Sequence, residues 1–231
     1  MDETAKQIID QIVGQVFGYQ NPFTLDQFRQ KFAFDVRLPS QVSDSTTGQS
    51  TWASSINPQK FMTMENARKR VEVDDFMPKP RPLNSIQDML SAWEEINYTS
   101  TERQIDSTKV GGSDCVYNSE DVYYSQDIRR SKHIVFSDNT EECEYVVASQ
   151  RSLTSTYCIK LDDSKECSKS FQVSWSAKVA SSMFIHDCYD IYECMFCSHI
   201  SSKKFCIANM QFSEEDYKSL KPMVVQWVLT Q

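Results

Sequence analysis

Every third position between Ser113 and Cys206 carries a small or medium-sized side chain. Of the 32 positions in this frame, 31 are Ser, Cys, Val, Ile, Leu or Thr, and the exception is Lys203. A strict period of three drifts off one face of an α-helix, which has 3.6 residues per turn, and a flat β-strand has a period of two. The pattern therefore predicts a coil of short strands and tight corners, in which the frame residues point inward.

A second period, of twelve residues, lies over the first. One residue past the inward frame, every twelfth position is apolar, whereas the positions half a repeat away are mostly polar. A residue next to an inward one points outward on an extended strand, so this set predicts an apolar stripe on one outer face. We call this stripe the apolar ladder, and it consists of Tyr123, Val135, Val147, Ile159, Phe171, Met183, Met195 and Ile207. The two periods together predict a mainly β protein built on a single-stranded β-solenoid, with about eight twelve-residue coils over residues 113–208.

The inward frame also has a pattern of side-chain volume. Up to Ile134 a Ser precedes each branched residue, and from Val173 the order is reversed. Each coil then contributes a similar volume to the interior, as a core without voids requires. Seven of the eight Cys lie in this frame, all but Cys115, and we expect them to be buried free thiols. Oxidation of a stacked pair, such as Cys194 with Cys206 one coil later, is the alternative.

In coil length and in its inward small residues, the stretch 113–207 resembles the insect antifreeze proteins. Their twelve-residue β-solenoid coils also place Cys, Ser and Ala inward at every third position. The resemblance implies an architecture and no activity. The outward Thr-x-Thr rows of that family are absent, and the apolar ladder has Tyr, Val, Ile, Phe and Met instead, so ice binding is not expected.

The segments outside the solenoid predict helices and a long connection. Residues 1–36 contain two amphipathic helices, which pack either on the protein's own solenoid or on another subunit; the second follows Thr24 in a capping-box pattern. Residues 37–82 have no sustained period and predict an extended arm or linker. Residues 83–112 contain an expected N-terminal capping helix from Ser85 to Ile96, and residues 209–231 an expected C-terminal cap.

Composition narrows the setting in which the chain works. The net charge of −8 disfavours direct binding to nucleic acid or to an anionic membrane surface. No run of about 18 apolar residues predicts a membrane span, and the first residues lack the pattern of a secretory signal peptide. We therefore expect the protein inside a cell or within a virion-like particle, and not secreted by a signal peptide.

Candidate chemistry is sparse. Cys188, Cys194, Cys197 and His199 have a spacing that zinc sites use, but the solenoid frame alone explains the three Cys, and His199 falls outside that frame. We therefore predict no metal, no cofactor and no catalytic residue. The enzymatic alternative is a solenoid acyltransferase-like protein, although the Gly and the uneven inward spacing of hexapeptide acyltransferases are missing.

These observations favour a non-enzymatic structural or interaction protein. We expect a rigid solenoid that acts as a subunit, cement or spacer in a large assembly such as a virion shell. Its partners would be other protein subunits rather than nucleic acid, a membrane or a small-molecule substrate. The apolar ladder is the predicted interface, and its half from Phe171 to Ile207 is expected to bind a partner.

Overall fold

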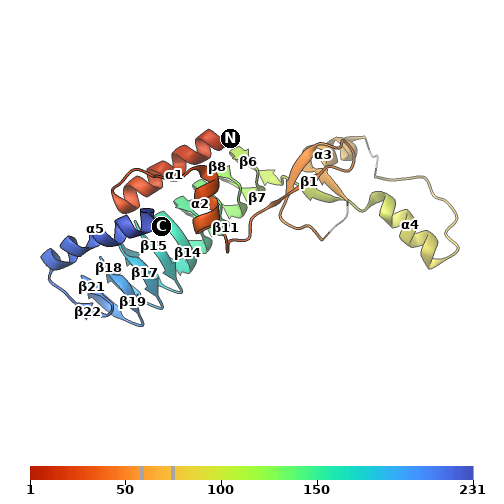
Figure 1. Cartoon of the computed structure of the whole chain (residues 1–231). Coiled ribbons are helices and arrows are strands. Elements are labelled where there is room, and N and C mark those ends of the chain that lie inside the picture. Colours follow the sequence, from red (N-terminus) through yellow and green to blue (C-terminus); the bar gives the residue numbers. More distant parts are fainter. Residues whose placement is uncertain (58–59, 74–75, 231) are drawn as a thin grey trace.

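The computed structural model describes residues 1–57, 60–73 and 76–230. The molecule is elongated, with a β-solenoid at one end and a small β-module with a protruding helix at the other (Figure 1). Its helices are α1 (Asp2–Phe17), α2 (Leu25–Phe32), α3 (Met64–Glu72), α4 (Ile86–Ile96) and α5 (Glu214–Thr230). The strands of the module are β1 (Ser40–Ser43), β2 (Ser50–Ala53), β3 (Phe61–Thr63) and β4 (Thr99–Thr101).

The solenoid has about nine turns, which confirms the predicted fold class and adds one turn before residue 113. Each strand pairs in parallel with the strand twelve residues further on, so Val135 lies between Tyr123 and Val147, as the period predicted. Its first strands are β5 (Gln104–Ile105), β6 (Thr108–Gly111), β7 (Asp114–Tyr117), β8 (Glu120–Tyr123), β9 (Gln126–Arg129) and β10 (Lys132–Val135). Next come β11 (Asp138–Glu141), β12 (Glu144–Val147), β13 (Gln150–Leu153), β14 (Thr156–Lys165), β15 (Phe171–Ser174) and β16 (Ala177–Ala180). The last are β17 (Met183–His186), β18 (Tyr189–Tyr192), β19 (Met195–Ser198), β20 (Ser201–Lys204), β21 (Cys206–Ile207) and β22 (Met210–Gln211).

The corners of each coil use a left-handed backbone conformation. Every third residue from Cys115 to Ala208, the one just before each inward residue, has φ between 45° and 59°. None of these residues is Gly, although a side chain in this region costs about 1–2 kcal/mol. Hydrogen bonds between coils offset part of this cost, because the N–H of a corner residue such as Phe136 donates to the Tyr123 carbonyl (3.1 Å).

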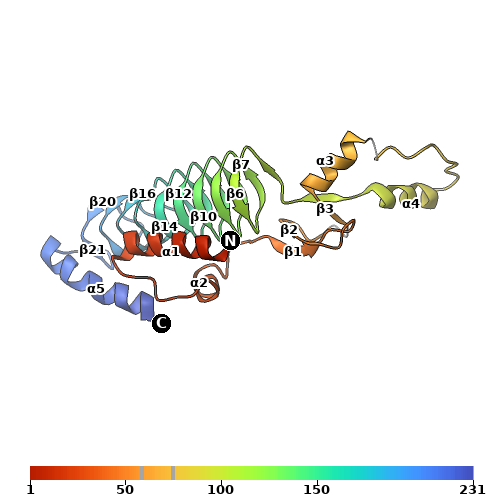
Figure 2. The ribbon, with the colours of Figure 1, turned by 90° about the horizontal axis from the view of Figure 1, so that it is seen from above.

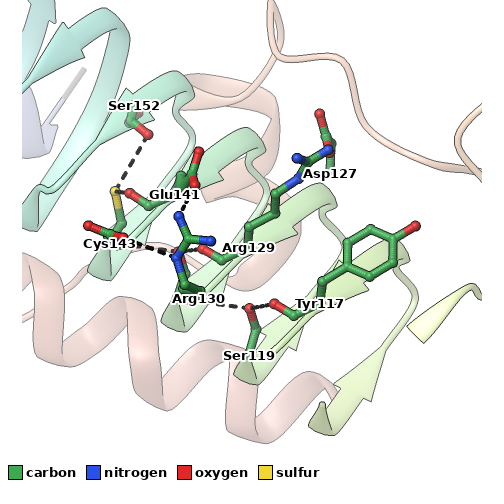
Figure 3. Close-up of polar contacts among 10 residues, drawn as sticks. Tyr117, Ser119, Asp127, Arg129, Arg130, Glu141, Cys143 and Ser152 are labelled. Atoms are coloured by element: carbon green, nitrogen blue, oxygen red, sulfur yellow. Dashed lines mark hydrogen bonds and ion pairs between the residues drawn. The ribbon is translucent and has the colours of Figure 1, made fainter. Parts of the chain in front are cut away.

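Inward Ser residues do more than fill a narrow core. The hydroxyl of Ser131 donates to the Arg129 carbonyl (2.8 Å) and accepts the backbone N–H of Cys143 in the next coil (3.1 Å). The same two bonds recur at other inward Ser such as Ser125 and Ser176, whereas the Oγ of Ser152 has no hydrogen-bond partner among the described residues. Figure 3 shows the bond to the carbonyl two residues earlier at Ser119, which donates to the Tyr117 carbonyl. It also shows a further contact, in which the Cys143 thiol reaches the Ser152 carbonyl. A hydroxyl or thiol therefore satisfies buried backbone N–H groups that a hydrocarbon would leave unpaired.

The volume pattern of the frame describes the core correctly. Four of the inward residues, Val122, Ile134, Ser176 and Val179, are all buried, as their positions in the frame predict. Inward residues that stack on one another lie twelve residues apart and form columns along the axis. Because the order of Ser and branched residues reverses after Ile134, one column changes from Ser to larger residues, while the adjacent column changes from larger residues to Ser. Val173, for example, continues the column that contains Ser149. The total volume of the cross-section is thereby maintained along most of the axis.

The apolar ladder is covered by the protein's own helices, and this corrects the predicted partner interface. Seven ladder residues are at most 6% exposed, and Ile207 is partly buried. Phe17 of α1 and Phe32 of α2 pack on Phe171, with ring centroids 5.2 and 5.6 Å away. Beyond Phe171, α5 covers the half that was assigned to a partner, through Tyr217, Val225 and Val228. The eight residues of this stripe, Tyr123, Val135, Val147, Ile159, Phe171, Met183, Met195 and Ile207, therefore form an internal core rather than an interface.

The predicted arm is partly folded. Strands β1 and β2 form an antiparallel pair, and β3 pairs in parallel with β4, so most of residues 37–82 belongs to a small module; residues 58–59 and 74–75 of this range lie outside the described part. The module is attached to the first coil by Asp114, which accepts hydrogen bonds from the Arg103 side chain (2.7 and 3.0 Å) and from the Ser54 N–H (2.8 Å). Burial alone would raise the pKa of the Asp114 carboxyl, but these hydrogen bonds outweigh it and lower the pKa.

The two ends of the solenoid differ from the expected caps. Helix α4 begins at the predicted Ser85 cap but lies far from the solenoid, beyond the module (Figure 2). At the other end, α5 runs back along the ladder side, while β22 folds antiparallel onto β21. Lys203, the charged exception in the inward frame, lies in the fully exposed strand β20. Strand β20 is the last strand of its face of the solenoid, and a Lys at such an exposed edge discourages further strands from adding to the stack.

Candidate interaction surfaces

Helix α4 presents an uncovered apolar face. Ser85 caps its first turn by accepting the N–H of Asp88 (3.1 Å), and the spacing of its apolar residues places them along one side. Between 39% and 70% of each of these side chains is exposed, for Ile86, Met89, Leu90, Trp93 and Ile96. The amphipathic pattern was readable from the sequence, but the expectation that it packs on the first coil was wrong.

A second apolar surface lies where the end of α1 meets α5. A groove there is lined by Tyr19, Pro22, Pro222, Met223 and Leu229, together with uncharged polar residues. Tyr19 and Met223 are both more than half exposed. This groove and α4 lie toward opposite ends of the molecule (Figures 1 and 2). We call it the terminal groove.

The solenoid face away from the ladder contains a third surface, an open groove parallel to the axis. Two rows of outward side chains border it, one residue of each row per coil, and the inward residues between them form its floor. One row is Arg151, Asp163, Trp175, Asp187 and His199, and the other is Leu153, Lys165, Ala177, Tyr189 and Ser201. We call this surface the axial groove.

The charged and polar side chains of the axial groove form ion pairs and ring contacts with neighbouring side chains. His199 Nδ1 lies 2.7 Å from the Asp187 carboxylate, and Arg151 Nε lies 3.5 Å from Asp163. Lys178 lies over the ring of Tyr189, 5.3 Å from its centroid. Trp175 is 61% exposed, although its backbone is fixed by an N–H bond to the Asp162 carbonyl (2.9 Å). The groove thus combines exposed aromatic rings with a nearly balanced set of charges.

The Cys residues of the candidate zinc site lie inside the solenoid, away from His199. All eight Cys are free, and the thiols of Cys188 and Cys197 donate to backbone carbonyls of their own coils. Burial raises the pKa of Cys143 to about 11 and also raises the pKa of Cys188 above its usual value. Within residues 1–57, 60–73 and 76–230, no three His, Cys, Asp or Glu side chains are placed to hold a metal ion.

The remaining His residues are engaged in surface contacts. His133 stacks on Tyr145 (4.2 Å between ring centroids) and lies 3.2 Å from the Asp121 carboxylate. His186 and His199 meet edge to face, with 5.8 Å between their ring centroids.

The axial groove was not predicted from the sequence, because its two rows appeared only as mostly polar positions. The twelve-residue period was the signal that would have aligned Trp175 with Asp187 and His199.

Comparisons with models of protein families, with curated proteins and with solved structures find no match to this chain. Among the described helices, none combines the length and the hydrophobicity of a membrane-spanning segment. The arguments for function therefore rest on the three surfaces themselves.

Proposed function

We propose that the protein is a non-enzymatic structural subunit that assembles head to tail with copies of itself, α4 of one copy binding in the terminal groove of the next. The observation that carries this proposal is the uncovered apolar face of α4, held away from the body of the same chain. A helix of 11 residues is marginal in water without a partner, so its exposed face favours a bound state. Trp93, at the middle of that face, provides the aromatic anchor that protein interfaces favour.

The terminal groove fits this helix in length and chemistry. The apolar face of α4 from Ile86 to Ile96 is about 15 Å long, and the α5 wall from Pro222 to Thr230 is about 12 Å long, at 1.5 Å per residue. None of the groove-lining residues is charged. On α4, Asp88 and Glu95 project from the side opposite to the apolar face, and Glu94 lies at its margin, so docking leaves these three carboxylates toward solvent.

Docking of α4 in the terminal groove of a second copy is favoured over packing of the α4 helices of two copies against each other. Two α4 helices packed together would bury one short face on each side and leave the terminal groove uncovered. Docking of α4 in the groove covers both surfaces in a single contact. The contact is heterologous, so it extends into a chain of subunits unless the rotation between copies closes a ring.

The coil length shared with insect antifreeze proteins supports the architecture and not this role. Rigidity supports the role, because coils joined throughout by hydrogen bonds keep the terminal groove at a fixed distance from the first coil, to which the module that precedes α4 is attached. A virion shell is the setting we propose by analogy, since such lattices use small rigid modules with extended arms.

Complementation between two defective variants tests the proposal. Trp93→Asp disables α4 and Met223→Asp disables the groove, while Leu153→Asp is an exposed control on another face. Sedimentation velocity should give concentration-dependent polymers for the wild type and the control, and monomers for each variant alone. A mixture of the two variants should give a dimer and nothing larger.

Other patterns would refute head-to-tail assembly. A Met223→Asp protein that still dimerises while Trp93→Asp is monomeric would assign the contact to two α4 helices. A wild type that remains monomeric at every concentration would remove self-assembly altogether. Circular dichroism of each variant establishes that the solenoid itself is intact.

A further inference from the structure

We propose that the axial groove is a binding site for a linear, uncharged oligosaccharide. This inference is independent of the assembly proposal, because the groove lies on another surface and involves neither α4 nor the terminal groove. It rests on the exposed rings of Trp175 and Tyr189, on the polar pairs beside them, and on the direction in which the groove runs.

The positions of the side chains that line the axial groove repeat from one coil to the next. Its two rows contribute one side chain each per coil, and coils are about 4.8 Å apart, so contacts recur at even intervals over the coils from Arg151 to Ser201. Ala177 is smaller than both of its neighbours in the row and leaves a hollow between Lys165 and Tyr189. A regular groove of this kind fits an extended polymer whose units repeat, rather than a single compact molecule.

The side chains suit a polyhydroxylated ligand. One face of a pyranose ring presents C–H groups, which pack on an aromatic ring such as that of Trp175. Hydroxyl groups both donate and accept hydrogen bonds, and the groove offers both kinds of partner. The carboxylates of Asp163 and Asp187 accept, whereas the guanidinium of Arg151 donates. Contacts across the coils hold several of these groups in place before any ligand arrives, which lowers the entropy lost on binding.

Other classes of polymer fit less well. An extended peptide would need free backbone groups at a strand edge, but here the N–H groups of Lys165, Ala177 and Tyr189 are bonded to the next coil at 3.1–3.2 Å. Nucleic acid is disfavoured by Asp163 and Asp187 in the groove and by the net charge of −8. A folded protein partner would require a larger apolar centre, and Leu153 and Ile200 are the aliphatic residues present beyond Ala177.

Isothermal titration with defined hexasaccharides tests the site. The neutral probes are cellohexaose, maltohexaose, mannohexaose and fully N-acetylated chitohexaose, with hexagalacturonate as the charged comparison. Trp175→Ala removes the central ring, and Ala177→Arg fills the hollow without altering a left-handed corner. Tyr192→Ala is the matched control, because it removes an exposed aromatic ring of the same solenoid that does not line the groove.

We expect at least one neutral hexasaccharide to bind the wild type and Tyr192→Ala equally, and to bind Trp175→Ala and Ala177→Arg about tenfold more weakly or worse. A loss of tenfold corresponds to about 1.4 kcal/mol. Binding that survives both groove substitutions, or no binding of any neutral probe at millimolar concentration, overturns the proposal. Preference for hexagalacturonate overturns the claim that the ligand is uncharged. Capture of a folded protein that Ala177→Arg abolishes, with no sugar bound, would assign the groove to a protein.

Discussion

The inward hydroxyl groups give the sharpest test of how this solenoid is held together. Ser131 is fully buried, and its Oγ is the acceptor for the backbone N–H of Cys143. In Ser131→Ala that N–H would lose its partner, whereas the Arg129 carbonyl would keep the bond from the Glu142 N–H (3.1 Å). One buried donor is therefore left unsatisfied, at a cost of about 1–3 kcal/mol in the free energy of unfolding.

Two further variants isolate the hydrogen bond from side-chain volume. Ser131→Cys should lose less stability than Ser131→Ala, since Cys143 already accepts the Ser155 N–H through its sulfur at 3.4 Å. Thr140→Val, in the next coil, replaces a buried hydroxyl whose Oγ1 has no hydrogen-bond partner in the described part of the chain. Removal of that hydroxyl should stabilise the protein by up to about 1 kcal/mol.

Thermal unfolding followed by circular dichroism, with urea titration for the free energy, measures all three variants. At about 2–4 °C per kcal/mol for a chain of this size, Ser131→Ala should lower the melting temperature by roughly 2–12 °C. The reasoning fails if Ser131→Ala and Thr140→Val change stability in the same direction. That result would mean that the frame selects Ser for its size alone.

Two further predictions concern the corners and the module. Thr154 is an exposed β-branched residue with φ of 48°, so Thr154→Asn should raise the free energy of unfolding by about 1 kcal/mol, while its neighbour Leu153→Asn should give no such gain. Because the folded protein lowers the pKa of Asp114, the stability from this carboxylate is present at neutral pH and lost as pH falls below about 3.9. The protection factors of residues 40–53, which correct hydrogen exchange for its intrinsic dependence on pH, should therefore fall in acid before those of the solenoid, and Asp114→Asn should show lower protection already at pH 7. Equal protection factors at both pH values would contradict this.

Much of the fold was predictable because the same pattern of residues recurs in every coil of the repeat. The spacing of three identified the buried frame, and the spacing of twelve gave the register that places Val135 between Tyr123 and Val147. The capping pattern of Thr24 and Gln27 also predicted the start of α2. These features depend on neighbours one coil away or closer, so the local sequence contains them.

The reason for Ser in the frame was only half predictable. Volume explains why a small residue fits, but the bond from Ser131 to the Cys143 N–H depends on where the left-handed corners direct backbone groups. The corner residues with positive φ are as varied as Trp175 and Lys178, so the type of a residue does not predict that it forms a corner. It is imposed by the stacking of coils, each of which holds the next in place.

By itself the sequence determined that this chain forms a β-solenoid with an apolar ladder and amphipathic helices, because each of these follows from a period. Only the tertiary structure decided which apolar surfaces meet. It placed α1, α2 and α5 over the ladder and left α4 uncovered, although the ladder and α4 have equally clear patterns. Hydrophobic attraction is not directional, so the pattern of an apolar stripe predicts that the stripe is covered but not which segment covers it. The connectivity of the chain and the lengths of the helices determine which segment that is.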